Sequence, residues 1–132
     1  MALGRQNSTQ QKGYARIQVR FNDAGVAAGA GKQWLPLGAI ITRTDVVVTE
    51  VFNAATTNVI TVGIAGVADN IVAAADVNEG ATGLTQNIKP TGTALGPLAA
   101  PGQITVTYTQ TGAAATAGTA HIIVEYVCDN DL

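Results

Sequence analysis

Residues 13–21 read GYARIQVRF, a stretch in which apolar and polar side chains alternate. One set consists of the apolar side chains Ala15, Ile17, Val19 and Phe21. The other set consists of Tyr14, Arg16, Gln18 and Arg20. Successive side chains of a strand point to opposite faces of a sheet, so the alternation predicts a half-buried β-strand whose first set faces a core.

The same alternation recurs in three later stretches, which read NVITVGI (residues 58–64), QITVTYTQ (residues 103–110) and AHIIVEYVC (residues 120–128). A longer strand is expected over residues 39–52. Its alternation slips at residues 44–48, which indicates a β-bulge or burial on both faces.

The rest of the chain predicts short strands separated by loops. Short strands are expected at residues 34–37, 85–88 and 94–98. Segments rich in Gly, Ala and Thr predict loops at residues 22–33 and 111–118, and residues 67–78 suit a turn or a single helical turn.

Roughly eight strands without a βαβ rhythm predict an all-β fold. The expected form is an antiparallel two-sheet β-sandwich, with a jelly roll as the favoured topology. The expected inner layer contains Ile17, Val19, Phe21, Ile60, Val62, Ile104, Val106, Tyr108, Ile122 and Val124.

The composition agrees with strands and turns. The chain has 132 residues, of which 47% are hydrophobic and 12% charged, and it contains 15 glycines. A chain of this length buries roughly two-thirds of the surface of its unfolded form, so it needs no disulfide or metal to fold. We expect a flexible basic N-terminal arm at residues 1–12 and a single β-sandwich domain at residues 13–132.

The single cysteine, Cys128, excludes an intrachain disulfide and a zinc site built from cysteines. The first residues, MALGRQNSTQQKG, are polar where a secretory signal requires an apolar stretch. No apolar run reaches the roughly 18 residues of a membrane-spanning helix. The sequence therefore predicts synthesis in a cytoplasm and no membrane partner.

Charge is distributed unevenly along the chain. Residues 1–43 contain six basic residues and one acidic residue, a net charge of +5, whereas residues 44–132 contain one basic residue and eight acidic ones, a net charge of −7. This split indicates a basic arm or face that docks on an acidic partner. The alternative is a solvated arm without a partner.

Motifs that would indicate nucleotide binding or nucleophilic catalysis are incomplete. The stretch GAGKQ at residues 29–33 is similar to a phosphate-binding loop, but Gln33 replaces the Ser or Thr that would bind magnesium and Val26 replaces the first glycine. His121 is the only histidine, which excludes a histidine-based triad and a multi-histidine metal site. We expect it to face outward from a strand without a chemical role.

The acidic residues allow two further interpretations. Two pairs, Asp45 with Glu50 and Asp76 with Glu79, have the residue type of glycosidase carboxylates, although such acids usually lie on solvent-facing loops. Another group, Asp129, Asn130 and Asp131, could bind calcium or form a soluble tail. Few aromatic residues lie among the basic ones, which argues against direct nucleic-acid contact. We expect no catalytic residue, cofactor or metal.

Five stretches together resemble the head decoration, or cement, proteins of tailed bacteriophages. They read LGAIITRTDVVVTEVFNAATTNVITVGIAG (residues 37–66), DNIVAAADV (69–77), GTALGPL (92–98), QITVTYTQTG (103–112) and TAGTAHIIVEYV (116–127). The resemblance covers most of the chain from about residue 13 onward, and the N-terminal arm departs from it.

The resemblance implies a structural virion protein with no catalytic residues. Such a protein is made in the cytoplasm of the host bacterium, sits on the outer surface of the capsid and bridges neighbouring copies of the major capsid protein. The low charge and Thr-rich outward faces of the strands also leave their edges open to pairing, so we expect a homo-oligomer, either a dimer or a trimer.

Capsid exteriors are commonly acidic, so the basic front of the chain is expected to dock there. The expected docking residues are Arg5, Lys12, Arg16 and Arg20. An alternative function is a carbohydrate-binding jelly-roll module of a phage tail or surface protein, in which sugars stack on exposed aromatic side chains. An enzyme is the third possibility.

Overall fold

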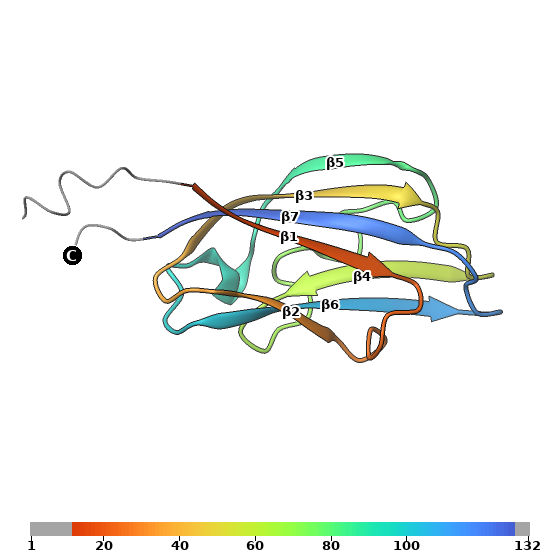
Figure 1. Ribbon diagram of the computed structural model, residues 1–132, viewed down its shortest axis with the longest axis horizontal. Coiled ribbons are helices and arrows are strands. Elements are labelled where there is room, and N and C mark those ends of the chain that lie inside the picture. Colours follow the sequence, from red (N-terminus) through yellow and green to blue (C-terminus); the bar gives the residue numbers. More distant parts are fainter. Residues whose placement is uncertain (1–11, 129–132) are drawn as a thin grey trace, which may run out of the picture.

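The computed structural model describes residues 12–128 and contains seven strands and one short 3-10 helix (Figure 1). The elements are β1 (Lys12–Arg20), β2 (Ala30–Leu35), β3 (Ile40–Glu50), β4 (Thr57–Gly63), β5 (Gly83–Ile88), η1 (Gly92–Leu95), β6 (Gly102–Thr111) and β7 (Thr119–Val127). The prediction of an all-β fold is confirmed. In this part of the chain, no helix is long and apolar enough to cross a membrane.

The strands form two antiparallel sheets that pack face to face. One sheet has four strands in the order β1-β7-β3-β5, and the other has three in the order β2-β6-β4. Consecutive strands lie in opposite sheets, so the chain crosses between the layers at each connection. A bridge between Val62 and Val72 adds a further short pairing at β4. With that bridge counted as a strand, the order is that of an eight-stranded jelly roll.

The core lies between the two sheets and is built by the alternating positions. Nine of the ten predicted inner residues are buried. Phe21 is the exception, because it follows the end of β1 and packs against the core from its rim. Phe52 and Tyr108 are the largest fully buried side chains. The prediction of the inner layer is therefore confirmed, with Phe21 at its margin.

One predicted strand is wrong. The strand expected at residues 94–98 is replaced by η1 and a loop. Gly92 and Gly96 have φ angles of 54° and 63°, a region that breaks an extended chain and is accessible mainly to glycine. Pro97 follows Gly96 directly and has no backbone N–H for a sheet ladder.

Other boundaries shift because of bulges. Strand β2 begins at Ala30, inside the predicted loop 22–33, and its register with β6 shifts between Gly31 and Trp34. Strand β3 has register shifts against both neighbouring strands, one of them between Thr44 and Val46. Within residues 44–48 the buried positions still alternate, at Thr44, Val46 and Val48. The change of parity lies before them, between the buried residues Ile41 and Thr44, where the register with β7 shifts.

The pairing of β1 with β7 fixes where the described chain begins and ends. Lys12 lies opposite Val127 in this ladder, so both ends of the described chain emerge at one end of the sandwich, which we call the terminal end (left in Figure 1). Strand β2 finishes and β6 begins at the same end, where Leu35 is opposite Gly102.

Candidate docking surfaces

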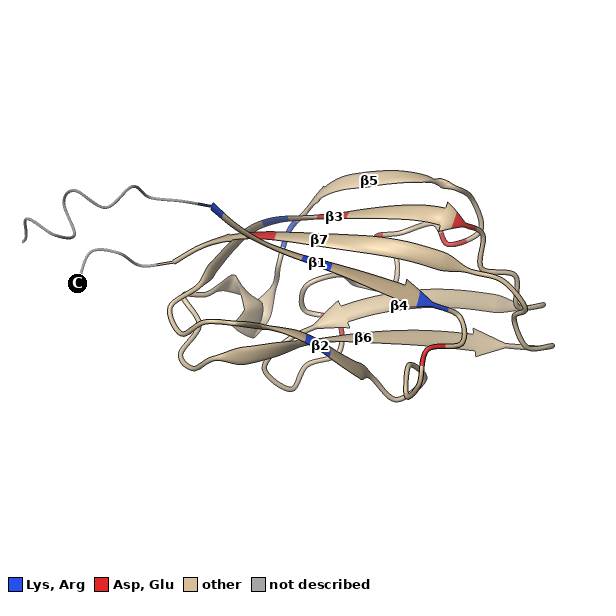
Figure 2. Ribbon diagram, in the orientation of Figure 1, with Lys and Arg blue, Asp and Glu red and all other residues tan. Residues whose placement is uncertain are grey.

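The outer face of β1 is basic. Lys12, Arg16 and Arg20 are spaced four residues apart on one side of the strand, and all three are exposed. Figure 2 shows the basic positions along β1 in blue. Lys12 forms an ion pair with Glu125 at 3.4 Å. The side chains of Arg16 and Arg20 make no ion pair or hydrogen bond within residues 12–128.

The structure thus brings together three of the four predicted docking residues. Lys12, which the sequence interpretation assigned to the arm, is the first residue of β1. Residues 1–11, and with them Arg5, lie outside the described residues.

Two acidic residues on the same sheet, Asp45 and Glu125, form ion pairs with basic residues of the chain. Arg43 donates two hydrogen bonds to Asp45 Oδ2, of 2.7 Å and 3.2 Å, and the N–H of Asn87 donates to Asp45 Oδ1. Burial raises the pKa of Asp45, but these bonds outweigh it and leave the pKa lowered. The pKa of Glu125 is also lowered, chiefly by the hydrogen bond from Thr42. Of the charged residues on β1, Arg16 and Arg20 have no ion pair in the described part of the chain, whereas Lys12 is paired with Glu125.

The strands of the opposite sheet carry one charged residue, Lys32 on β2, and it forms an ion pair with Asp23. Strands β4 and β6 contain no charged residue (Figure 2). Thr105, Thr107 and Thr109 alternate with the buried residues of β6, as predicted, and point away from the core. The two faces of the sandwich therefore differ in charge, and they suit different neighbours.

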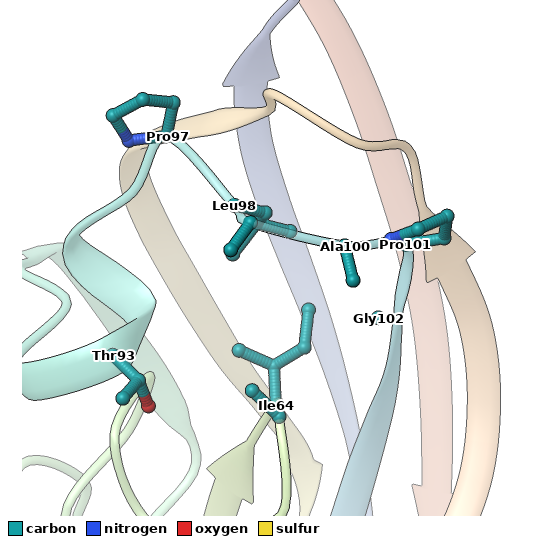
Figure 3. Close-up of a pocket in the computed structure, with 9 residues that line it drawn as sticks. Ile64, Thr93, Pro97, Leu98, Ala100, Pro101 and Gly102 are labelled. Atoms are coloured by element: carbon teal, nitrogen blue, oxygen red, sulfur yellow. The ribbon is translucent and has the colours of Figure 1, made fainter.

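A pocket of about 350 Å³ opens at the terminal end (Figure 3). Its lining residues are Ile64, Ala65, Thr93, Pro97, Leu98, Ala99, Ala100, Pro101 and Gly102. None of these residues is charged and none is aromatic. The pocket therefore suits an apolar side chain better than a sugar or an ion.

Buried hydrogen bonds hold the walls of the pocket in place. The side chain of Asn70 accepts a hydrogen bond from the N–H of Ile64 at 2.9 Å and donates to the Ile64 carbonyl oxygen at 3.0 Å. It also donates to Thr93 Oγ1 at 2.9 Å, which ties η1 to the end of β4. Leu98 is fixed by backbone hydrogen bonds with Gly38 and Ala39. The pocket is thus formed without an occupant.

Two further features mark this end of the sandwich. Ala65, in the pocket wall, has a φ angle of 58°, a strained conformation for a residue with a side chain. Leu37, in the loop between β2 and β3, and Leu95, the last residue of η1, are 61% and 58% exposed. The sequence interpretation missed the pocket because it treated residues 79–101 as connecting chain. The charge-free run GPLAAPG at residues 96–102 is the signal that could have indicated it.

The described residues do not bring a metal-binding cluster together. No group of three His, Cys, Asp or Glu side chains within residues 12–128 could hold a metal ion. His121 is partly exposed on β7. The predicted calcium ligands Asp129, Asn130 and Asp131 lie outside the described residues. In the loop-like stretch at residues 29–33, the amino group of Lys32 pairs with Asp23 at 3.4 Å.

The predicted carboxylate pairs serve structural hydrogen bonds. Glu50 accepts from the N–H of Gly118, and Asp76 accepts from that of Ala73. Glu79 is 5% exposed, and its Oε1 accepts from the N–H of Ile60 at 2.8 Å. Burial raises the pKa of Glu79. This carboxyl group satisfies a backbone donor of β4 and has no cation beside it in the described part of the chain.

Replacing Glu79 with glutamine should make the fold less sensitive to pH. The raised pKa means that the folded protein binds this proton more tightly than the unfolded chain does, so the free energy of unfolding falls as pH rises through the folded pKa. Glutamine keeps an oxygen acceptor for the Ile60 N–H and carries no charge. We expect E79Q to be more stable than wild type at neutral pH and nearly equal to it at pH about 4.

Urea denaturation of both proteins at a series of pH values would measure this difference. D69N, a change at an exposed carboxylate, is the matched control and should leave the pH dependence as in wild type. Parallel pH profiles for wild type and E79Q would contradict the assignment.

Comparison with known proteins rests on structure, because no family model and no curated protein matches the sequence. Three solved structures share the fold. The first, a cyanophage Pam1 capsid asymmetric unit, matches with a TM-score of 0.64 and 18% identity over 91% of this chain and 86% of that chain. The second, the acidic stable capsid structure of Helicobacter pylori bacteriophage KHP30, matches with a TM-score of 0.64 and 14% identity over 90% of both chains.

The third, the capsid of Ralstonia phage GP4, matches with a TM-score of 0.58 and 18% identity over 93% of this chain and 88% of that chain. The shared fold is one found in phage capsid structures. The alignments cover about nine-tenths of this chain, so the shared fold includes both sheets.

Proposed function

We propose that the chain is a structural virion protein that decorates the outside of a tailed-phage capsid and bridges neighbouring subunits of the major capsid protein. The observation that carries this proposal is the fold, which is shared along about nine-tenths of the chain with chains from three phage capsid structures. The resemblance of the sequence to cement proteins supports the same role. The contribution of such a protein is mechanical rather than catalytic.

The basic face of β1 is the proposed capsid-docking surface. It presents Arg16 and Arg20, which have no ion pair among residues 12–128, with Lys12 on the same strand, and Arg5 would extend it from the arm. Each exposed ion pair contributes only about 0–1 kcal/mol, so charge orients the protein rather than holding it. Several such contacts on one homo-oligomer would add up to tight attachment through multivalency.

The double variant R16E/R20E should bind undecorated heads more weakly than wild type. The loss should be larger at low salt than at high salt, because screening already weakens exposed pairs in high salt. The melting temperature should change little, since both side chains are exposed and neither makes an ion pair or hydrogen bond among the described residues. Co-sedimentation with heads at two salt concentrations would measure the effect.

A matched control is K89E, which changes one exposed positive charge outside β1. It should bind more tightly than the double variant at both salt concentrations. Equal binding by wild type and R16E/R20E at low salt would show that β1 is not the docking surface.

The alternative carbohydrate-binding function is favoured by two exposed aromatic side chains, Tyr14 on β1 and Trp34 on β2, which are 59% and 63% exposed. The strands that carry them, β1 and β2, belong to different sheets. The pocket has no aromatic side chain in its lining on which a sugar could stack. Binding to a glycan array that W34A abolishes, together with no binding to heads, would favour this function over capsid decoration.

A further inference from the structure

We infer that the pocket at the terminal end receives the side chain of Leu3 from a neighbouring copy of this chain. The inference rests on the proposed function, in which the protein attaches to a capsid as a homo-oligomer. It adds a specific, apolar contact between them, with the wall formed by Ile64 and residues 97–102 as the receptor (Figure 3).

The chemistry of the pocket selects an apolar occupant. The pocket has a lining without charge, and its walls are fixed by Asn70 and by backbone hydrogen bonds of Leu98. A preformed apolar pocket loses little conformational entropy on binding, so an apolar side chain that fills it becomes an anchor. Glu, Asp, Lys or Arg side chains would lose hydration there without gaining a partner.

The position of the pocket selects the segment before β1. Residues 1–11 lead into Lys12, which lies at the terminal end as the pocket does. Met1 and Leu3 are the large apolar side chains of that segment, and most of its other residues are polar. Leu3 stands nine positions before Lys12, and nine residues of extended chain span about 30 Å. That reach is sufficient for a pocket on an adjacent molecule.

An apolar contact through Leu3 would also supply a linkage that salt does not weaken, which the charges of β1 do not. Exposed ion pairs are weak and are screened by salt, whereas burial of a leucine side chain is insensitive to screening. Linkage through Leu3 would therefore persist at high salt, when attachment through Arg16 and Arg20 has weakened.

Disulfide trapping between two full-length variants tests the contact directly. Both carry C128S; one also carries L3C, and the other, of different mass through an affinity tag, carries A100C. Ala100 lies in the pocket wall and is exposed. Mild oxidation of the mixture should give a heterodimer on a non-reducing gel. Replacing A100C with A114C, an exposed position in the loop between β6 and β7, should lower the yield at least tenfold.

Sedimentation equilibrium of the free protein, without heads, supplies the second readout. The variants L3S and A100E should each weaken self-association at least tenfold, and the combined variant should lose little more than either alone, because both remove the same contact. The controls Q10S and A114E should associate as wild type does.

Three results would overturn the inference: a wild-type chain that stays monomeric at high concentration, equal trapping yields at positions 100 and 114, or additive losses in the combined variant. Trapping within one chain, seen with L3C and A100C in the same molecule but never between molecules, would also overturn it. Binding to undecorated heads is measured separately. A protein that self-associates through Leu3 but does not bind heads would count against the proposed function alone.

Discussion

Replacing Gly63 with alanine should lower the free energy of unfolding by about 3 kcal/mol or more. Gly63 ends β4, and a Cβ atom there would lie far inside the contact distance of the Val67 carbonyl oxygen, with the carbonyl carbon atoms of Val67 and Ala68 also too close. These are backbone atoms, so no side-chain rotation relieves the overlap. The loop after β4 would have to move away from the sandwich.

That movement would also disturb the pocket. The loop begins with Ile64 and Ala65, which line the pocket, and Val67 donates its N–H to the Ile64 carbonyl oxygen at 3.3 Å. We therefore expect G63A to lose both stability and the trapping of L3C by A100C.

Thermal and urea denaturation of G63A and of the control G80A would measure the effect. A Cβ atom at Gly80 would approach only the side-chain oxygen of Asn78, at 3.3 Å, so G80A should change stability by about 0.5 kcal/mol or less. Similar losses in G63A and G80A would contradict the expected overlap.

Replacing Tyr108 with alanine should cost about 3–5 kcal/mol, because it removes the largest buried ring of the core. Tyr108 is 1% exposed, and its ring packs against that of Phe52 with centroids 4.9 Å apart and planes at 52°. Its hydroxyl group donates a hydrogen bond to Asn58 Oδ1. The side chain thus fills the space between the sheets and also closes a polar network.

Y108F separates these two contributions. It keeps the ring and removes only the hydroxyl group, and Asn58 Oδ1 still accepts a hydrogen bond from the N–H of Ala54 at 2.9 Å. The expected cost of Y108F is therefore about 1 kcal/mol. Urea denaturation of both variants would measure how much each change lowers the free energy of unfolding. If Y108F were as unstable as Y108A, the polar network rather than ring packing would dominate.

The strands of the sandwich were predictable wherever one face of a strand is buried and the other is exposed to solvent. In β1, β6 and β7 each buried residue alternates with a more exposed one, and the period of two is visible in the sequence. Strand β2 was harder to place because its bulge breaks the period between Gly31 and Trp34. The segment at residues 94–98 failed for a different reason, since its composition fits a strand while Gly96 has a positive φ angle.

The basic face of β1 and the pocket also differ in how far the sequence predicts them. Lys12, Arg16 and Arg20 are even-numbered residues of one strand, so their common face follows from local geometry alone. The pocket unites the end of β4, η1 and the loop before β6, and its walls come from residues up to 38 positions apart in the sequence, Ile64 and Gly102. Such an arrangement depends on how the sheets pack, which no local pattern in the sequence encodes.

The pairing of Lys12 with Val127 gives the protein a direction of mechanical weakness. A load applied between the two ends of the described chain would act at one end of the β1–β7 ladder and peel its hydrogen bonds apart one after another. A load applied between the terminal end and the loops at the far end of the sandwich would instead pull along the strands, so that many hydrogen bonds of a ladder resist in shear at the same time. The domain therefore resists strain best when the particle loads it along its strands.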